Sequence, residues 1–269
     1  ETDMNPIAST NFTGRNRFEG KSVLVTGGAA GMGLAAARMF AAEGARVSVI
    51  DIQEEAGQAF VEEIESAGGQ AFFEAADLAN PGQTNQALEN VIKRVGAIDT
   101  LFNHAGTIIV KPFHETTDED YDRLMDINLR SAFMVTRKIV QHMKDNGGGS
   151  IVVTASIGSG RAFVYESLYC ITKAAVLMLS NSIAVEYRDY GIRCNAVCPG
   201  FVKTAHGLRE IDELDGLGQQ WQEADLAATQ VRICEPEEVA SAALFLASEE
   251  ASFINGAALY VDNGWLVKG

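Results

Sequence analysis

The sequence predicts an α/β protein built on a single doubly wound parallel sheet of seven strands, with helices on both faces of the sheet. Short apolar runs typical of buried strands alternate with segments whose apolar residues recur at helical spacing. The first run leads directly into a glycine-rich turn and a helix, and no linker interrupts the alternation over the 269 residues. Because strand–helix–strand connections are right-handed in nearly all proteins, the strands that they join should be parallel.

The expected strands are short and rich in apolar and β-branched residues, as suits a sheet covered on both faces. In chain order they are Ser22–Thr26, Arg46–Ile50, Ala71–Ala76, Thr100–Asn103, Ile151–Val153, Arg193–Val197 and Ala257–Val261. The expected helices carry residues typical of helix ends, such as Gly44 after the first and Pro236 at the start of the last. In chain order they are Leu34–Glu43, Gln83–Val95, Thr117–Met143, Leu168–Tyr190 and Pro236–Ser248. Residues 18–269 should form one domain, preceded by a loose polar arm over residues 1–17.

A glycine-rich turn, Gly27-Gly28-Ala29-Ala30-Gly31-Met32-Gly33, follows the first expected strand. A strand, a glycine turn and a helix in this order place free backbone N–H groups and the positive end of a helix where a pyrophosphate would lie. The glycines allow the phosphate to approach the backbone closely. An ordinary tight turn is the alternative, but the strand–turn–helix context favours a dinucleotide site.

Asp51 ends the second expected strand, 18 residues after Gly33. A carboxylate there can accept hydrogen bonds from both hydroxyls of an adenosine ribose and would repel a 2′-phosphate. The glycine turn and the next two residues, Ile52 and Gln53, contain no Arg or Lys to bind such a phosphate. The sequence therefore predicts NAD rather than NADP as the cofactor. Asp51 could also cap the following helix, and the two roles are compatible.

Tyr169 and Lys173 are four residues apart in an expected helix, so both side chains should emerge on one face. A phenol ionises near pH ~10, and its use as a base at neutral pH needs a downward pKa shift of roughly 2–3 units. A neighbouring ammonium group stabilises the phenolate. The pair therefore predicts a proton-transfer function, although a helix-surface tyrosine beside a solvated lysine has the same spacing.

Together these segments resemble the short-chain dehydrogenase/reductase family from about Gly20 to Trp265. Thr26-Gly27-x-x-x-Gly31-x-Gly33 is similar to the cofactor turn of that family. Asn103-His104-Ala105-Gly106 is similar to its Asn-Asn-Ala-Gly segment and departs from it at His104. The resemblance implies a Rossmann-type fold and a nicotinamide cofactor. The cofactor-binding residues that it implies are Gly27, Gly31, Met32, Gly33, Asp51, Ile52, Asp77, Leu78, Asn103, Ala105, Gly106, Tyr169, Lys173, Pro199, Gly200, Val202 and Thr204.

The resemblance also implies the catalytic residues, which are Asn128, Ser156, Tyr169 and Lys173. Ser156 precedes Tyr169 by thirteen residues, the usual spacing in the family. Asn128 lies within the expected helix Thr117–Met143, where the family uses an asparagine to open the helix and hold a proton-relay water. Asparagine is an indifferent helix former, so its presence there calls for such a reason.

The segment of residues 203–234 is long, acidic and without strand signals, and we expect it to cover the substrate pocket as a helical lid. We interpret its acidic residues as the solvated surface of the lid rather than as a means of selecting the substrate by charge. Aromatic residues and one histidine near this segment suggest an apolar substrate pocket, although the aromatic residues could equally belong to the core. These candidate pocket residues are Phe163, Tyr165, Phe201, His206 and Trp221.

Composition excludes several classes of function. The chain carries 21 basic and 36 acidic residues, a net charge of −15, which disfavours nucleic acid and anionic membranes as partners. No uninterrupted apolar run reaches the length of a membrane span. The four cysteines and four histidines show no metal-ligand spacing, so we expect no metal site. Free thiols in a cytoplasmic protein are the expectation.

We expect an NAD-dependent oxidoreductase that transfers a hydride between NAD(H) and a small secondary alcohol or ketone. A 3-oxoacyl thioester reductase has the same catalytic set, but Asp51 and the acidic lid argue against it. A non-catalytic nucleotide-binding scaffold would not need the set at all. The resemblance further implies a dimer or tetramer that assembles through Thr117–Met143, Leu168–Tyr190 and the segment Pro236–Val261, and of the two we expect a homotetramer.

Overall fold

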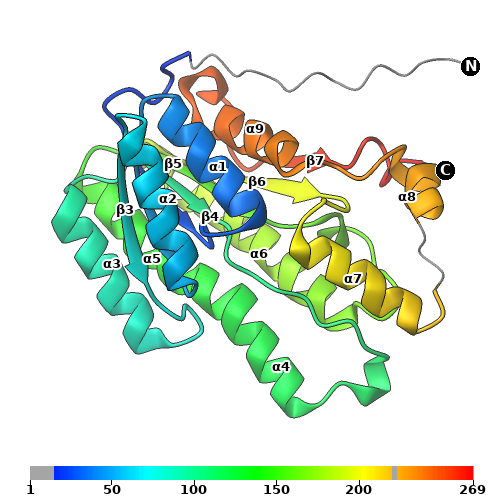
Figure 1. Cartoon of the computed structure of the whole chain (residues 1–269). Helices are drawn as coiled ribbons and strands as arrows, with labels where there is room; N and C mark the ends of the chain where they lie inside the picture. Colours follow the sequence, from blue (N-terminus) through cyan, green and yellow to red (C-terminus); the bar gives the residue numbers. More distant parts are fainter. Residues whose placement is uncertain (1–14, 220–222, 269) are drawn as a thin grey trace, which may run out of the picture.

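A computed structural model describes residues 15–219 and 223–268 and contains one parallel sheet (Figure 1). The sheet has seven strands in the order β3-β2-β1-β4-β5-β6-β7, and every neighbouring pair is parallel. The expected fold class is confirmed. The strands are β1 Ser22–Thr26, β2 Arg46–Asp51, β3 Gln70–Ala75, β4 Thr100–Asn103, β5 Gly149–Thr154, β6 Ile192–Pro199 and β7 Ala258–Val261.

Helices cover both faces of the sheet because successive strand residues point to opposite sides. Val23 and Val25 of β1 join an apolar cluster with α1, α2 and α9, whereas Leu24 joins a second cluster with α3, α5 and α6. The helices are α1 Gly31–Ala42, α2 Glu54–Ser66, α3 Pro81–Val95, α4 Asp118–Leu124, α5 Ser131–Asp145, α6 Ser167–Glu186, α7 Ala205–Gly216, α8 Glu223–Gln230 and α9 Pro236–Ala247. In Figure 1, α7 stands beyond the end of β6, apart from the two helix layers.

Two helices differ from the sequence prediction. The expected helix Thr117–Met143 is broken into α4 and α5 by the π-helical turn Met125–Arg130, a type of irregularity that apolar spacing does not reveal. The helix α2 follows Asp51 but was not predicted from the sequence. Its apolar side is narrow, with only Phe60, Ile64 and Gly57 buried, so its helical periodicity is weak.

The described part of the expected loose arm, residues 15–17, is held against the domain. Arg17 Nη2 lies 2.8 Å from Glu43 Oε1, and the backbone N–H groups of Arg15 and Arg17 donate to Glu43 Oε2. Glu43 is only 4 % exposed, so these contacts satisfy a buried carboxylate. The ordered domain therefore begins before residue 18, and residues 1–14 lie outside the described structure.

The helix α6 has an unusually apolar surface. Of the described helices it alone is long and apolar enough to cross a membrane by length and composition, a test that core helices also pass. It packs against β5, β6 and α5, which identifies it as a core helix. Ile171, Met178 and Val185 lie seven residues apart along it and are 52 %, 62 % and 69 % exposed. One apolar stripe of α6 is thus left uncovered by this chain.

Candidate active site

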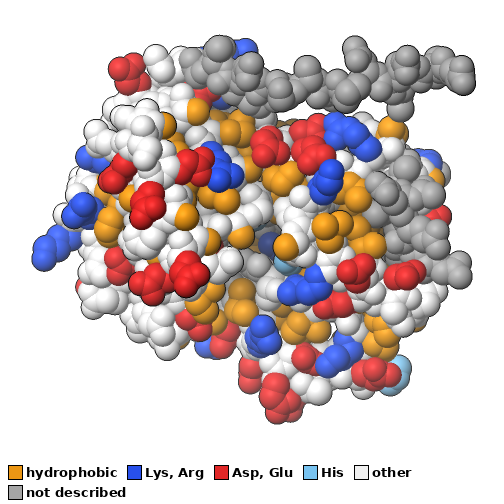
Figure 2. All heavy atoms as spheres, viewed as in Figure 1, with side chains coloured by type: hydrophobic (Ala, Val, Ile, Leu, Met, Phe, Trp, Pro, Cys, Tyr) orange, Lys and Arg blue, Asp and Glu red, His pale blue; other side chains and the backbone are white. Residues whose placement is uncertain are grey.

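A cleft of about 690 Å³ opens at the carboxyl ends of the strands, where open parallel sheets bind ligands. Seen as in Figure 1, the molecular surface is hollowed near its centre, and acidic and basic side chains are interspersed around the hollow (Figure 2). Most of the expected cofactor residues line this cleft. They are Gly27, Gly31, Met32, Asp51, Ile52, Asp77, Leu78, Ala105, Gly106, Tyr169, Lys173, Pro199, Gly200, Val202 and Thr204.

The glycine turn between β1 and α1 has the geometry of an anion site. Gly27 has a φ of 67°, a left-handed conformation that favours glycine. Gly33 does not line the cleft, but a Cβ atom there would overlap the carbonyl oxygen of Gly27, so the turn closes only with glycine. Ala30 precedes α1 and has no side chain that could cap it. The first N–H groups of α1 are therefore available to a phosphate at the positive end of the helix.

Asp51 is oriented by two backbone hydrogen bonds. Its Oδ2 accepts from Ala29 N and its Oδ1 from Gln53 N, both at 3.0 Å, and the residue is 7 % exposed. The carboxylate therefore ties β2 to the glycine turn and still lines the cleft. Each oxygen keeps a further lone pair for a ligand, so the structural and the ligand-binding roles are compatible.

Asn103, like Gly33, is an expected cofactor residue that does not line the cleft. Its amide donates to Ala132 O at 3.0 Å and to Thr136 Oγ1 at 3.1 Å, and its Oδ1 accepts from Thr26 Oγ1 at 3.0 Å. Asn103 therefore ties β4 to α5 and β1 and acts on the cleft only by fixing the loop that follows.

Ser156, Tyr169 and Lys173 come together in the same cleft. Ser156 follows β5 and lies close enough to Tyr169 for its hydroxyl to lower the pKa of the phenol. Lys173 Nζ lies 5.7 Å from the centre of the Tyr169 ring and donates to Thr154 O at 2.9 Å. The spacing of four residues in α6 and the end of β5 therefore place a phenol, a hydroxyl and an ammonium group around one space.

Burial governs the pKa of Tyr169. It raises the pKa of the phenol above its ordinary value, the charges of Glu210 and Glu166 raise it further, and the Ser156 hydroxyl lowers it only partly. Burial also lowers the pKa of Lys173, to about 8. Desolvation therefore opposes formation of the phenolate in the folded chain, whereas the spacing of Tyr169 and Lys173 indicated only the stabilising ammonium group.

Asn128 lies in the π-helical turn and is 1 % exposed. Its Nδ2 donates to Thr107 O at 2.8 Å and to Thr172 Oγ1 at 3.0 Å, and its Oδ1 accepts from Thr107 N at 2.8 Å. The residue does not itself line the cleft, but Thr107 and Ile127 do. Asn128 thus joins the loop after β4 to α6, the helix of the expected catalytic residues Tyr169 and Lys173, from a turn that departs from regular α-helical geometry.

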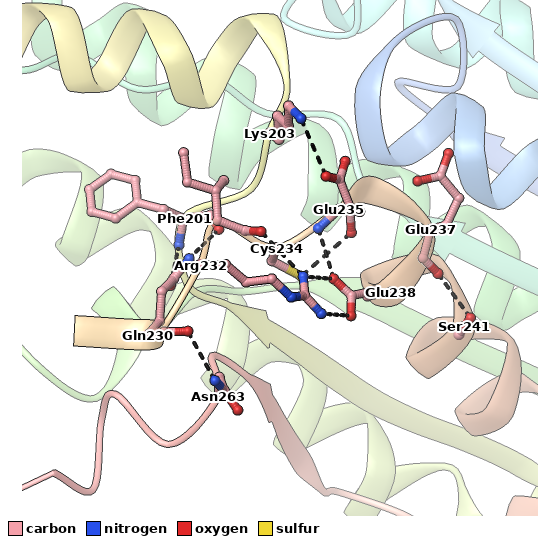
Figure 3. A network of polar contacts seen from close by, with 11 residues as sticks. Phe201, Lys203, Gln230, Arg232, Cys234, Glu235, Glu237, Glu238, Ser241 and Asn263 are labelled. Carbon is pink, nitrogen blue, oxygen red and sulfur yellow. Dashed lines mark hydrogen bonds and ion pairs between the residues drawn. The ribbon is translucent and has the colours of Figure 1, made fainter. Parts of the chain in front are cut away.

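The lid is fastened at both ends to the same place in the fold. Val202 and Cys234 form a parallel bridge, in which Lys203 N donates to Cys234 O at 2.8 Å and Cys234 N donates to Phe201 O at 3.1 Å. Gln230 exchanges two hydrogen bonds with the backbone of Phe201, of 2.8 and 3.2 Å (Figure 3). The structure describes α7 and α8 between these ends, so the segment is largely helical, and its role as a lid stays a prediction.

Three of the expected substrate-pocket residues pack together away from the cleft. Phe163 and Phe201 each lie with ring centres 5.4 Å from Trp265, and Tyr165 packs against the same cluster. None of the three lines the cleft, and Phe201 is buried, whereas Phe163 and Tyr165 are partly buried. His206 does line the cleft, and Trp221 lies outside the described residues. Several polar residues that no sequence pattern marked also line it, among them Thr107, Arg123, Arg209 and Glu210.

His104 lines the cleft as a neutral ring. Its Nδ1 is 2.9 Å from Thr154 Oγ1, and the ring stacks on Phe102. Burial, followed by the charges of Lys173 and His206, lowers its pKa from 6.5 to about 3. No role in the cleft was expected for His104 from the sequence, although its departure from the Asn-Asn-Ala-Gly segment of the family marked the position.

His104 should make the fold sensitive to acid. Because its pKa is lowered in the folded state, its contribution to stability is present above pH 6.5 and is lost as the pH falls toward 3. Between about pH 7.5 and 5 the free energy of unfolding should fall by up to about 2 kcal/mol more in the wild type than in His104→Asn. Urea unfolding at the two pH values measures this difference, and equal losses in the two proteins would contradict it.

Other parts of the described structure do not compete with this cleft. No group of three or more His, Cys, Asp or Glu side chains is placed to hold a metal in residues 15–219 and 223–268. A larger groove of about 1090 Å³ lies at the amino ends of the strands and is lined by Ser150 and Arg193. It contains neither the glycine turn nor any of the expected catalytic residues. The cleft at the carboxyl ends is therefore the candidate active site.

Comparisons with known proteins agree with this geometry. A family model described as "Enoyl-(Acyl carrier protein) reductase" matches residues 27–266. Cyclopentanol dehydrogenase of Comamonas sp. is 37% identical over 254 residues, which cover 93% of this chain and 98% of that protein. The crystal structure of levodione reductase has a TM-score of 0.89 at 32% identity and covers 94% of this chain and 100% of that one.

A third similar protein is a 3-ketoacyl-(acyl-carrier-protein) reductase from Brucella melitensis, solved in complex with NADH. Its TM-score is 0.82 at 30% identity, covering 92% of this chain and 99% of that chain. All of these matches span the glycine turn, the catalytic helix and the lid together, and all are oxidoreductases by name. The chain therefore belongs to the short-chain dehydrogenase/reductase family of oxidoreductases.

Proposed function

We propose that the protein is an NAD-dependent dehydrogenase that interconverts a small secondary alcohol and its ketone. The observation that carries the proposal is the convergence of Ser156, Tyr169 and Lys173 on the cleft that also contains the glycine turn and Asp51. Cyclopentanol dehydrogenase and levodione reductase, two similar proteins, are named for a secondary alcohol and a ketone.

The cleft fits a dinucleotide by the chemistry of its donors. Free N–H groups at the start of α1 suit the pyrophosphate, and Asp51 suits the adenosine ribose hydroxyls. Asp77 and Leu78 border the cleft where an adenine ring would lie. Ile52 and Gln53 bring no cation for a 2′-phosphate, which supports NAD over NADP. When bound, the nicotinamide supplies the hydride acceptor or donor, and its oxidised ring supplies a positive charge.

The side chains of the cleft divide the remaining chemistry. Ser156 orients the substrate oxygen by a hydrogen bond, and Tyr169 donates a proton to that oxygen in reduction or takes it in oxidation. Lys173, which is 5 % exposed, adds a buried positive charge beside the phenol and can hydrogen-bond the nicotinamide ribose. Asn128 holds the loop after β4 against α6, and we propose that it also positions a proton-relay water.

A 3-oxoacyl thioester reductase is the second candidate. The similar Brucella melitensis reductase and the two arginines of the cleft, Arg123 and Arg209, favour it, since arginine binds phosphate groups. However, Arg209 already donates to Thr107 Oγ1 and Ile108 O and lies 3.5 Å from Glu213. An acidic lid around it opposes an anionic carrier.

A substrate panel tests the proposed function. Secondary alcohols, cyclic alcohols and ketones and a 3-oxoacyl thioester are offered with NAD(H) and with NADP(H), and absorbance of the reduced nicotinamide is followed. We expect turnover of an alcohol or ketone with NAD(H). Turnover of the thioester alone would support the second candidate, and no turnover in any arm would support a nucleotide-binding scaffold.

We also propose that the protein assembles into a homotetramer. The uncovered stripe of α6 (Ile171, Met178 and Val185) and Phe133 of α5, which is 46 % exposed, are apolar surfaces that a second copy would bury. Multi-angle light scattering at micromolar concentration should give four times the mass of the 28.8 kDa chain. A monomer would contradict the proposal.

The four free cysteines of the structure support a reducing compartment such as the cytoplasm.

A further inference from the structure

Two glutamates from different elements meet beside the catalytic tyrosine. Glu166 immediately precedes α6, and Glu210 lies in the lid helix α7. Their carboxyl groups lie within hydrogen-bonding reach of each other, and the charge of each raises the pKa of Tyr169. Glu166 is 5 % exposed, and the side chain of Glu210 is 13 % exposed. Two carboxyl groups in direct hydrogen bonding must share a proton, as two adjacent negative charges would repel.

The position of Glu166 shows that this contact is not a by-product of helix capping. Glu166 occupies the N-cap position of α6, where an acidic side chain usually accepts from the free N–H groups of the first turn. Its carboxyl makes no such bond. It turns inward to Glu210 instead, at the cost of desolvation. Burial raises the pKa of both carboxyls, which agrees with a shared proton.

Only one member of the pair faces the cleft. Glu210 lines it together with Ser156 and Tyr169, whereas Glu166 does not. Glu166 therefore acts as a positioning residue that fixes the Glu210 carboxyl toward the space where the substrate would react. The remaining neighbours leave that carboxyl free to bind, since His206 Nε2 is 4.0 Å away, beyond a hydrogen bond. Arg209, on the same helix, is directed to Thr107 and Ile108.

We propose that Glu210, held by Glu166, is a specificity-determining residue that hydrogen-bonds a second hydroxyl of the substrate, so that the enzyme prefers diols or polyols to simple alcohols. This inference rests on the proposed function. A carboxyl pair that shares one proton can both donate and accept, which matches a hydroxyl group. A hydrocarbon in the same place would leave a buried carboxyl without a partner, and sites built for a hydroxyl discriminate strongly against substrates that lack it.

Charge makes a hydroxyl a better match than an ionic group. The pair carries one negative charge, and the lowered pKa of His206 keeps that neighbour neutral. Lys173 and Arg209 line the same cleft, so it offers a cationic substrate little net attraction. A carboxylate on the substrate would be repelled by the carboxyl pair itself. A neutral substrate with a second hydrogen-bonding group meets none of these penalties.

The test compares each diol with the simple alcohol of the same skeleton, cyclohexane-1,2-diol with cyclohexanol and butane-2,3-diol with butan-2-ol. In the wild type, kcat/KM should be higher for the diols. Glu210→Leu should lower the ratio of diol to simple alcohol by roughly 10- to 100-fold. Glu210→Gln, which keeps a donor and an acceptor, should retain part of the preference. Asp212→Leu, an exposed position on the same helix, should leave the ratio as in the wild type.

Two results would overturn the inference while leaving the proposed function intact. One is a wild-type enzyme that oxidises simple alcohols as efficiently as diols. The other is an equal loss for both substrates in Glu210→Leu, which would mean that the residue only supports the lid. Failure of every alcohol in the wild type would instead contradict the proposed function. Glu166→Gln supplies a second variant, which should reduce the diol preference while the cofactor dissociation constant stays unchanged.

Discussion

Substitution of Tyr169 by phenylalanine should lower the turnover number by about 10²–10⁴, the typical effect of removing a positioned acid–base group. Phenylalanine keeps the ring that lines the cleft and removes only the hydroxyl on which Ser156 acts. Lys173 retains its hydrogen bond to Thr154 O, so the cofactor site should survive. Stopped-flow turnover at saturating substrate and NADH binding by fluorescence measure the two effects separately.

Tyr165 offers a matched control for this variant. It lies four residues earlier and packs in the aromatic cluster rather than in the cleft. Tyr165→Phe should therefore keep turnover within a few fold of the wild type. If Tyr169→Phe retained near-wild-type turnover, or if Tyr165→Phe lost as much, the acid–base assignment would be wrong.

Substitution of Asp51 by alanine should weaken NAD binding by about 1–3 kcal/mol and reduce the preference for NAD over NADP. Part of that loss is structural, because Ala29 N and Gln53 N lose their acceptors. The structural part weakens both cofactors alike, whereas loss of the carboxylate removes a repulsion felt by the 2′-phosphate alone. The ratio of the two dissociation constants, measured by titration calorimetry, therefore isolates the contribution of the carboxylate.

Glu54→Ala controls for the change in net charge, since Glu54 lies three residues further on and is exposed. Its cofactor ratio should equal that of the wild type. A wild-type enzyme that binds NADP as tightly as NAD would refute the cofactor proposal. An Asp51→Ala variant with an unchanged ratio would show that the carboxylate serves only the glycine turn.

The sheet could be predicted from the sequence because buried parallel strands are continuous apolar runs between turn residues. Ser22–Thr26 and Thr100–Asn103 were predicted with the bounds that β1 and β4 have, and the other strands were predicted within a few residues. The break between α4 and α5 was not predicted, because a π-helical turn preserves the apolar spacing on both of its sides. Here Asn128 gave the only sign of irregularity, through its low helix propensity.

The candidate site was likewise predicted from the sequence only in part. The glycine turn, Asp51 and the pair Tyr169–Lys173 act through backbone geometry and short spacings, which a sequence displays directly. The pairing of Glu166 with Glu210 spans 44 residues and depends on how the lid sits, so no local pattern predicts it. The substrate pocket is harder to predict, because Phe163 and Phe201 pack against Trp265, a contact that no sequence spacing indicates.

The bridge between Val202 and Cys234 brings the first and last residues of the lid together on the body of the domain. A segment whose two ends are neighbours can be exchanged for one of another length without moving the sheet, since doubling a loop costs only about 0.6 kcal/mol in closure entropy. Under the proposed function, the segment between these two residues would contact the substrate, whereas the glycine turn, Tyr169 and Lys173 lie outside it. Grafting a foreign segment between Val202 and Cys234 should therefore change which substrate is used without altering the residues proposed to transfer the hydride and the proton.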